Sequence, residues 1–159
     1  MGNSADVTAV NSRVADVLAD AAQQLLDTTV PPFGEGHCAA HVRKAFLSAF
    51  AKVGKKGVPE TPYAYNYGEM YILAGFTEVA SGKLDKARDP VLKGYIEKIG
   101  DVVVFAKNET HDNGHVEMYT SKGWVSDFEQ AHFVPWPANY VGITFKIYRL
   151  VTIPEPAAS

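Results

Sequence analysis

The spacing of the apolar residues changes along this chain, and the change limits what it can fold into. Up to residue 76 the apolar side chains recur every three or four positions, which is the period of a helix that buries one face. Beyond residue 100 they gather in short runs rich in β-branched residues, which is typical of strands. Helices first and strands second favour the α+β class. We therefore predict N-terminal helices packed on one side of an antiparallel sheet.

Three segments carry the helical spacing. The first begins at an Asn11 cap, after a loose lead-in over residues 1–10, and ends before Pro31 because a residue that precedes proline is pushed out of the helical region. The second begins at Cys38 and runs to about residue 53, where a glycine ends it. The third is short and ends at Gly75. The apolar stripe of the second helix consists of Val42, Ala45, Phe46, Ala49 and Phe50.

Four segments carry the strand spacing. Residues 81–94 are polar and mixed, which indicates a surface excursion before the first strand, and residues 152–159 form a short tail. The chain has no internal repeat, and 159 residues suit one domain with one core. The predicted strands cover residues 102–105, 115–120, 124–129 and 143–151.

Composition and charge exclude several classes. Hydrophobic residues make up 47% of the chain, so it should fold by itself, and a net charge of −3 offers no positive excess for nucleic acid. No apolar run is long enough to span a membrane. The N-terminal residues lack the features of a Sec signal, so we expect synthesis in the cytoplasm. Because Cys38 is the single cysteine, no internal disulfide is possible, and its thiol must be structural, metal-binding or reactive.

Cys38 lies at the predicted start of the second helix, directly after His37 and a Gly-Glu-Gly turn. The positive end of the helix dipole and the unpaired backbone N–H groups there favour the thiolate and lower its pKa. The same N–H groups suit a developing oxyanion. The opposite interpretation is that a lone cysteine on an apolar helix face is a small buried hydrophobe.

His115, at the start of a predicted strand, supplies the base and charge partner that a thiolate nucleophile needs. A third polar group must then fix the imidazole tautomer, and Asp127 is the candidate. If residues 121–123 form a three-residue hairpin loop, Asp127 shares a sheet face with His115 as its diagonal neighbour. A two-residue loop at positions 122–123 would instead bring Ser126 to that side. The carboxylate is the better candidate because it also stabilises the imidazolium.

Five short motifs follow one another along residues 30–150. They are Gly36-x-Cys38-Ala39-x-x-Val42-Arg43, Tyr67-Gly68 with Gly75-Phe76, Gly100-Asp101-Val102-Val103-Val104-Phe105, Gly114-His115-Val116, and Gly123-Trp124-Val125-Ser126-Asp127-Phe128. The ordered set resembles the NlpC/CHAP superfamily of papain-like peptidoglycan amidases. The resemblance implies a Cys-His-polar triad that hydrolyses amide bonds of cell-wall stem peptides or their cross-links. By matching position the triad is Cys38, His115 and Asp127. The third position varies in the superfamily among His, Asn, Gln and acids.

The resemblance also suggests a biological setting. A compact single catalytic domain without a signal peptide or wall-binding repeat is similar to the amidase toxins that bacteria inject by type VI secretion. Phage-lysis and cellular remodelling enzymes share those traits. A toxin would act in the periplasm or cell wall of a target bacterium, and an immunity protein would plug its cleft around Cys38. The mechanism implies no cofactor and no metal. Which stem-peptide bond is cut depends on loop shape.

Two further residues are candidates for substrate binding. By family resemblance, Tyr67 lies near the oxyanion and can donate its hydroxyl to it. His37 is a candidate because its place next to Cys38 in the sequence would let it line the cleft. Simple packing for Tyr67 and a solvated side chain for His37 are the alternatives.

Two other classes stay open. One is a zinc-dependent hydrolase, because Cys38 with His41, and His111 with His115, have spacings that metal ligands use. The segment around His111 has a loop composition, however, so its spacing has no helical meaning. The other is a binding module that keeps this architecture without its chemistry.

Overall fold

The structure, a computed structural model, describes residues 4–28, 38–109 and 112–153. In this part of the chain three α-helices and one 3₁₀ helix come first: α1 (Ser4–Thr28), α2 (Cys38–Ala51), η1 (Ala64–Asn66) and α3 (Tyr67–Leu73). Five strands follow them: β1 (Phe76–Lys83), β2 (Val102–Phe105), β3 (His115–Thr120), β4 (Gly123–Val125) and β5 (Thr144–Leu150).

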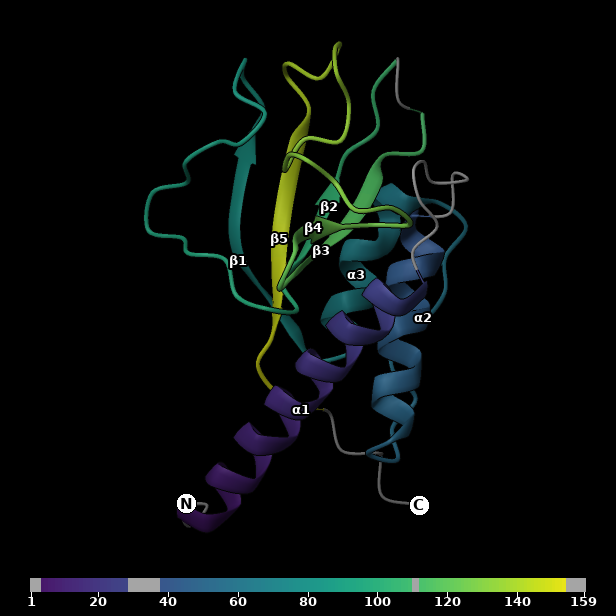
Figure 1. Cartoon of the computed structure of the whole chain (residues 1–159), viewed down its shortest axis with the longest axis vertical. Helices are drawn as coiled ribbons and strands as arrows, with labels where there is room; N and C mark the ends of the chain where they lie inside the picture. Colours follow the sequence, from purple (N-terminus) through teal and green to yellow (C-terminus); the bar gives the residue numbers. More distant parts are fainter. Residues whose placement is uncertain (1–3, 29–37, 110–111, 154–159) are drawn as a thin grey trace.

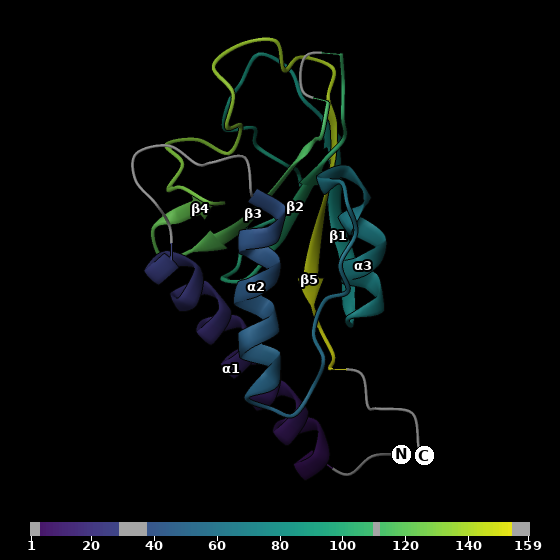
Figure 2. The same ribbon diagram turned by 90° about the vertical axis from the view of Figure 1, so that its right-hand side faces the viewer.

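The strands form one sheet in the order β1-β5-β2-β3-β4, and all neighbours run antiparallel. Helices α1 and α2 lie side by side and pack on β3, whereas α3 packs on β1 and β5 (Figure 1; Figure 2). All three helices cover the same face of the sheet (Figure 2). The predicted α+β class, with N-terminal helices on an antiparallel sheet, is confirmed.

Apolar side chains fill both faces of the sheet. The first cluster lies between the sheet and the helices and includes the whole predicted stripe of α2. Its rings meet edge to face, with the ring centroid of Phe46 lying 5.9 Å from that of Tyr71 and 5.1 Å from that of Phe76. On the opposite face, strand residues such as Phe105 are covered by loop residues such as Phe133. Loops thus form the second covering layer.

Glycines end two of the helices where the sequence predicts. Gly54 has a φ of 73°, and the N–H groups of Gly54 and Lys55 donate to the carbonyls of Ala51 and Phe50 at 3.0 Å each. Helix α3 ends just before Gly75, whose φ is 103°. Among the described helices, none combines the length and the apolar character that crossing a bilayer requires.

Helix α1 begins earlier than predicted. It starts at Ser4 rather than at Asn11, so the expected loose lead-in over residues 1–10 is wrong for residues 4–10. No proline or glycine lies between Ser4 and Thr28, so nothing in the backbone interrupts the helix. Asn11 is a common cap residue, but it is also tolerated inside a helix that is otherwise favourable.

Strand β1 was not predicted, and the expected surface excursion over residues 81–94 overlaps its end. This strand lies at the edge of the sheet and pairs only with β5, with an irregularity between Glu78 and Ala80. Along the strand only Phe76 is fully buried. An edge strand with one buried residue and a bulge does not show a period of two in its sequence.

Strand β4 is shorter than predicted and shifted by one residue. Its partner across the hairpin from Thr120 is Gly123, whereas the three-residue loop required Trp124. The loop therefore consists of residues 121–122, and both loop alternatives drawn from the sequence are wrong. The Thr120 hydroxyl closes this loop: it donates to the Gly123 carbonyl at 2.8 Å and accepts from the Lys122 N–H at 3.1 Å. Sequence patterns did not reveal this side-chain closure.

The chain reverses where the predicted strand over residues 124–129 was expected to continue. Strand β4 ends at Val125, which then forms an isolated bridge with Glu129. The N–H of Gln130 donates to the carbonyl of Trp124 at 3.0 Å. After the reversal, Gln130 lies beside β4, and its side chain reaches β3.

Candidate active site

Cys38 and His115 meet where the tip of α2 reaches the start of β3. Cys38 is the first residue of α2, and His115 is the first residue of β3. Their side chains form a hydrogen bond. Cys38 is partly exposed, whereas His115 is buried with 6% of its surface accessible. The two side chains whose pairing the sequence predicts are therefore in contact.

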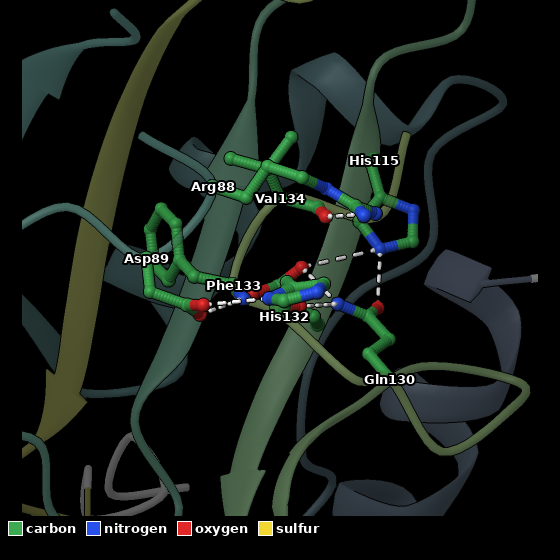
Figure 3. Close-up of polar contacts among 8 residues, drawn as sticks. Arg88, Asp89, His115, Gln130, His132, Phe133 and Val134 are labelled. Atoms are coloured by element: carbon green, nitrogen blue, oxygen red, sulfur yellow. Dashed lines mark hydrogen bonds and ion pairs between the residues drawn. The ribbon is translucent and has the colours of Figure 1, made fainter. Parts of the chain in front are cut away.

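Gln130 holds the other side of the imidazole. The Nε2 atom of His115 lies 2.8 Å from the Oε1 atom of Gln130, as Figure 3 shows. The ring is also packed against two aromatic rings, with centroid distances of 5.9 Å to Phe105 and 5.8 Å to Trp136. Because an amide oxygen only accepts, Nε2 carries a proton, and Nδ1 is the nitrogen that faces the thiol of Cys38.

The two groups stabilise each other's charge. Burial opposes ionisation of the Cys38 thiol, but the positive charge and hydrogen bond of His115 outweigh it and lower the pKa of Cys38. Burial also opposes the charging of His115, yet the Cys38 thiolate and Glu117 raise the pKa of His115 well above its usual value. Each charge thus favours the other, and contact between the two groups stabilises the thiolate and imidazolium forms of the pair.

A backbone group of β3 adds a second hydrogen bond to the sulfur. The backbone N–H of Val116 hydrogen bonds to Cys38 and also lowers its pKa. On β3, Tyr119 exchanges hydrogen bonds with residues on the β2 side, so by alternation the N–H of Val116 points toward the opposite edge. Strand β4 pairs with β3 only from Met118 onward. The edge beside Val116 is therefore open to the tip of α2.

Asp127 lies close enough to this pair for its charge to act on the sulfur. It is buried with 3% of its surface accessible, and its negative charge raises the pKa of Cys38. The residue that hydrogen bonds to Nε2 of His115 is Gln130, which no sequence pattern singles out. The only sequence signal for it was that the resembling superfamily also uses Gln at the third position. Its place depends on the chain reversal after Val125.

Two crystal structures are similar to this chain. One is the type VI native effector-immunity complex Tae3-Tai3 from Ralstonia pickettii, with a TM-score of 0.61 and 29% identity over 84% of this chain and 98% of that chain. The other is the selenomethionine form of the Tae3-Tai3 complex from the same organism, with a TM-score of 0.59 and 29% identity over 82% of this chain and 99% of that chain. No protein-family model matches the sequence, and no curated protein matches it.

The two residues expected to bind substrate differ in what the structure shows. Tyr67 is buried with 3% of its surface accessible and packs against Tyr71 at a centroid distance of 6.1 Å. It therefore belongs to the core cluster beneath the helices. His37 lies outside the described residues, as does His111.

A groove of about 730 Å³ opens between the start of α3 and the outer strands of the sheet. One wall is attached to the loop that leads to His115, because the N–H of Tyr65 donates to the carbonyl of Asn113 at 3.1 Å. The strand side of the groove carries two lysines, Lys83 and Lys146. The other lining residues include Asn66, Gly68, Glu69, Ser81, Val104, Ala106, Thr144 and Tyr148.

The arrangement of possible metal ligands bears on the zinc alternative. Within residues 4–28, 38–109 and 112–153, no three His, Cys, Asp or Glu side chains are grouped so that they could hold a metal ion. The ring of His41, one of the ligands in the zinc alternative, contacts the backbone carbonyl of Thr28 at 3.2 Å.

Proposed function

We propose that this chain is an antibacterial peptidoglycan amidase delivered by type VI secretion, and that it works as a papain-like cysteine amidase of the NlpC/CHAP type. The observation that carries the chemistry is the contact between Cys38 and His115, with Gln130 on the far side of the ring. The likeness to chains of a type VI effector-immunity complex supports the biological setting. We assign the third position of the triad to Gln130, and Asp127 becomes a neighbour that tunes the sulfur.

In the first half of the proposed reaction, the Cys38 thiolate attacks the carbonyl carbon of a stem-peptide amide. The charge that develops on the carbonyl oxygen is stabilised by the backbone N–H of Cys38, at the positive end of α2. His115 then gives its Nδ1 proton to the departing nitrogen as the C–N bond breaks. An amine leaves, and the acyl group stays on sulfur as a thioester.

In the second half, water releases the acyl group. The neutral imidazole of His115 takes a proton from the water that attacks the thioester carbonyl. The C–S bond breaks, the carboxylic acid product departs, and the thiolate and imidazolium form again. The Gln130 amide oxygen accepts the Nε2 proton in both halves, so the ring keeps one orientation throughout. These reaction steps need no cofactor.

The groove between the start of α3 and strands β1 and β5 suits a peptide that carries carboxylates. Stem peptides present free carboxylates, and Lys83 and Lys146 offer positive charge along the strand side. The Lys146 side chain is 61% exposed and also reaches Glu78 at 3.4 Å, so its charge is partly shared. We place the stem peptide in this groove, with the scissile amide at Cys38.

The proposal implies a partner and a place of action. An enzyme that cuts the wall must be silenced in the cell that makes it, so an immunity protein is the expected partner. It would cover the accessible side of Cys38. The wall of a target bacterium is the expected place of action.

Digestion of purified sacculi tests the proposed function. Wild-type protein should release soluble fragments whose masses correspond to hydrolysis of one amide bond, and mass spectrometry of the fragments identifies that bond. Cys38→Ala and His115→Ala should each reduce the rate by about a thousandfold or more, since both groups act in the same step. A folded Cys38→Ala protein that still digests sacculi refutes the proposal.

A further inference from the structure

A buried carboxylate lies two residues beyond His115 on the same strand. Glu117 has no accessible surface, and its Oε1 atom is 3.4 Å from the Nε2 atom of His115. Alternation along β3 puts the two side chains on one face of the sheet. The proposed reaction steps do not use Glu117. A carboxylate enclosed in this way is costly unless its contacts compensate, so those contacts indicate what it does.

The contacts of Glu117 fix the orientation of the Gln130 amide. The Nε2 atom of Gln130 donates to Glu117 Oε1 at 2.8 Å and to the carbonyl of His132 at 3.0 Å. With the amide turned the other way, its oxygen would face two oxygen acceptors, and its NH₂ group would face the protonated Nε2 of His115. Two acceptors on one side of Gln130 therefore oblige its oxygen to face His115. The dashed contacts of Gln130 are visible in Figure 3.

We propose that Glu117 is a positioning residue for the Cys38 and His115 pair: through Gln130 it selects the imidazole tautomer, and its negative charge sustains the imidazolium. The inference rests on the proposed function for its role in hydrolysis. The geometry itself concerns only how His115 is held and charged. Glu117 does not touch substrate or the reacting atoms.

The charges around Glu117 determine when this support is present. Burial raises the pKa of Glu117 to about 7, although His115 and Gln130 act in the opposite direction. The nearby acid Asp89 also raises the pKa of Glu117. Of the other charged groups, Cys38 raises the pKa of His115, and Asp127 raises the pKa of Cys38. Above neutral pH Glu117 is ionised and holds the proton on His115. The effect of removing it should therefore appear at the alkaline end of the range where the pair is charged.

Alkylation of Cys38 tests the inference without any substrate. The rate of reaction with iodoacetamide, followed from pH 4 to 10, changes once as the thiolate forms and again as His115 loses its proton. In Glu117→Gln the second change should move to lower pH by about one unit, because a nearby opposite charge has been removed. Hydrolysis of sacculi should fall most at the alkaline end of the profile, by up to about tenfold once the pH exceeds the pKa of His115 in both proteins, since one unit of pKa then corresponds to tenfold in the charged pair.

The controls separate positioning from folding. Glu129→Gln removes an exposed carboxylate from the same segment as Gln130 and should leave both changes where they are in the wild type. Glu117→Met keeps the volume but removes both the charge and the acceptor for Gln130, so its second change should move at least as far as that of Glu117→Gln, with folding of each variant checked by thermal unfolding. The inference is overturned if a folded Glu117 variant alkylates with the wild-type profile, or if neither variant folds, since the role is then structural. A shifted profile in a protein that digests no sacculi supports the inference and removes the proposed function.

Discussion

Val116 donates its backbone N–H to the sulfur of Cys38, from the strand position next to His115. Strand β3 therefore contributes two different donors to one thiolate at the tip of α2: a main-chain group from Val116 and a ring nitrogen from His115. A main-chain donor does not titrate, so it stabilises the thiolate at every pH at which the fold persists. The ring nitrogen adds a charge that depends on pH.

The first prediction concerns the reactivity of Cys38. Its lowered pKa keeps the thiolate below the usual pH of thiol ionisation, and the raised pKa of His115 keeps the imidazolium above its usual range. The charged pair should exist between these two limits, and it is lost as the pH falls through the first or rises through the second. At pH 6 we expect iodoacetamide to alkylate Cys38 at least about tenfold faster than a cysteine in an unstructured peptide. His115→Ala should abolish this advantage. Equal rates for wild type and peptide would contradict it.

The second prediction separates Gln130 from Asp127 as the residue that orients the imidazole. Gln130→Leu removes the acceptor at Nε2 of His115 and should reduce hydrolysis by about tenfold to a hundredfold, as the loss of a partner that orients a histidine does. Asp127→Asn should cost less than about threefold and should lower the pKa of Cys38 further, because the negative charge near the sulfur is gone. A larger loss for Asp127→Asn than for Gln130→Leu would return the third position to the acid.

The third prediction concerns the residue before His115. Gly114 has a φ of 68°, and a Cβ atom there would collide with the carbonyl oxygen of Phe105 and lie 3.0 Å from the Cβ of Tyr65. Gly114→Ala should lower the free energy of unfolding by about 1–3 kcal/mol and displace His115 from the sulfur, with loss of activity. Gly123→Ala is the matched control, because its φ is 87° but a Cβ would meet no described atom within 4 Å. It should cost about 1 kcal/mol and leave activity intact. Chemical denaturation of both variants measures the difference.

The fourth prediction concerns the segment that carries Gln130. Asp89 accepts from the His132 ring at 2.6 Å and from the N–H of Phe133 at 2.8 Å, which ties residues 88–89 to residues 132–134 (Figure 3). Asp89→Ala should lower the free energy of unfolding by about 0.5–1 kcal/mol, a value limited by solvent exposure. Hydrolysis should fall a few-fold as Gln130 loosens.

This fourth effect has a defined pH dependence and a control. Burial would raise the pKa of Asp89, but the His132 and Phe133 hydrogen bonds outweigh it and lower that pKa. The contribution of Asp89 should therefore be complete above the usual aspartate value of 3.8 and disappear as the pH falls through the lowered pKa. Lys122→Ala, which removes an exposed ion pair to Glu129 at 3.6 Å, should leave stability and activity unchanged. An equal loss in both variants would contradict a specific role for Asp89.

Local patterns predicted the positions of Cys38 and His115. The α2 stripe, the glycine after it and the β-branched runs are each set by a few neighbouring residues, so Cys38 at a helix tip and His115 at a strand start followed from the sequence. Their contact followed from the order of the motifs. Gln130 did not follow, because its place depends on a loop of two residues, closed by the Thr120 hydroxyl, and on a reversal after Val125. A shift of one residue in the pairing of β3 with β4 changes which side chain reaches His115. The amino-acid composition of this segment does not determine that pairing strongly.

The short length of β4 has a consequence for engineering. A longer hairpin would add ladder hydrogen bonds and, by ordinary measures, make a more regular protein. It would also occupy the flank of β3 where the thiolate now rests against the main chain of Val116. Under the proposed function, an accessible thiolate and a complete sheet exclude each other at this position. A stabilising redesign that extends β4 by two residues should therefore give a more stable protein without hydrolytic activity.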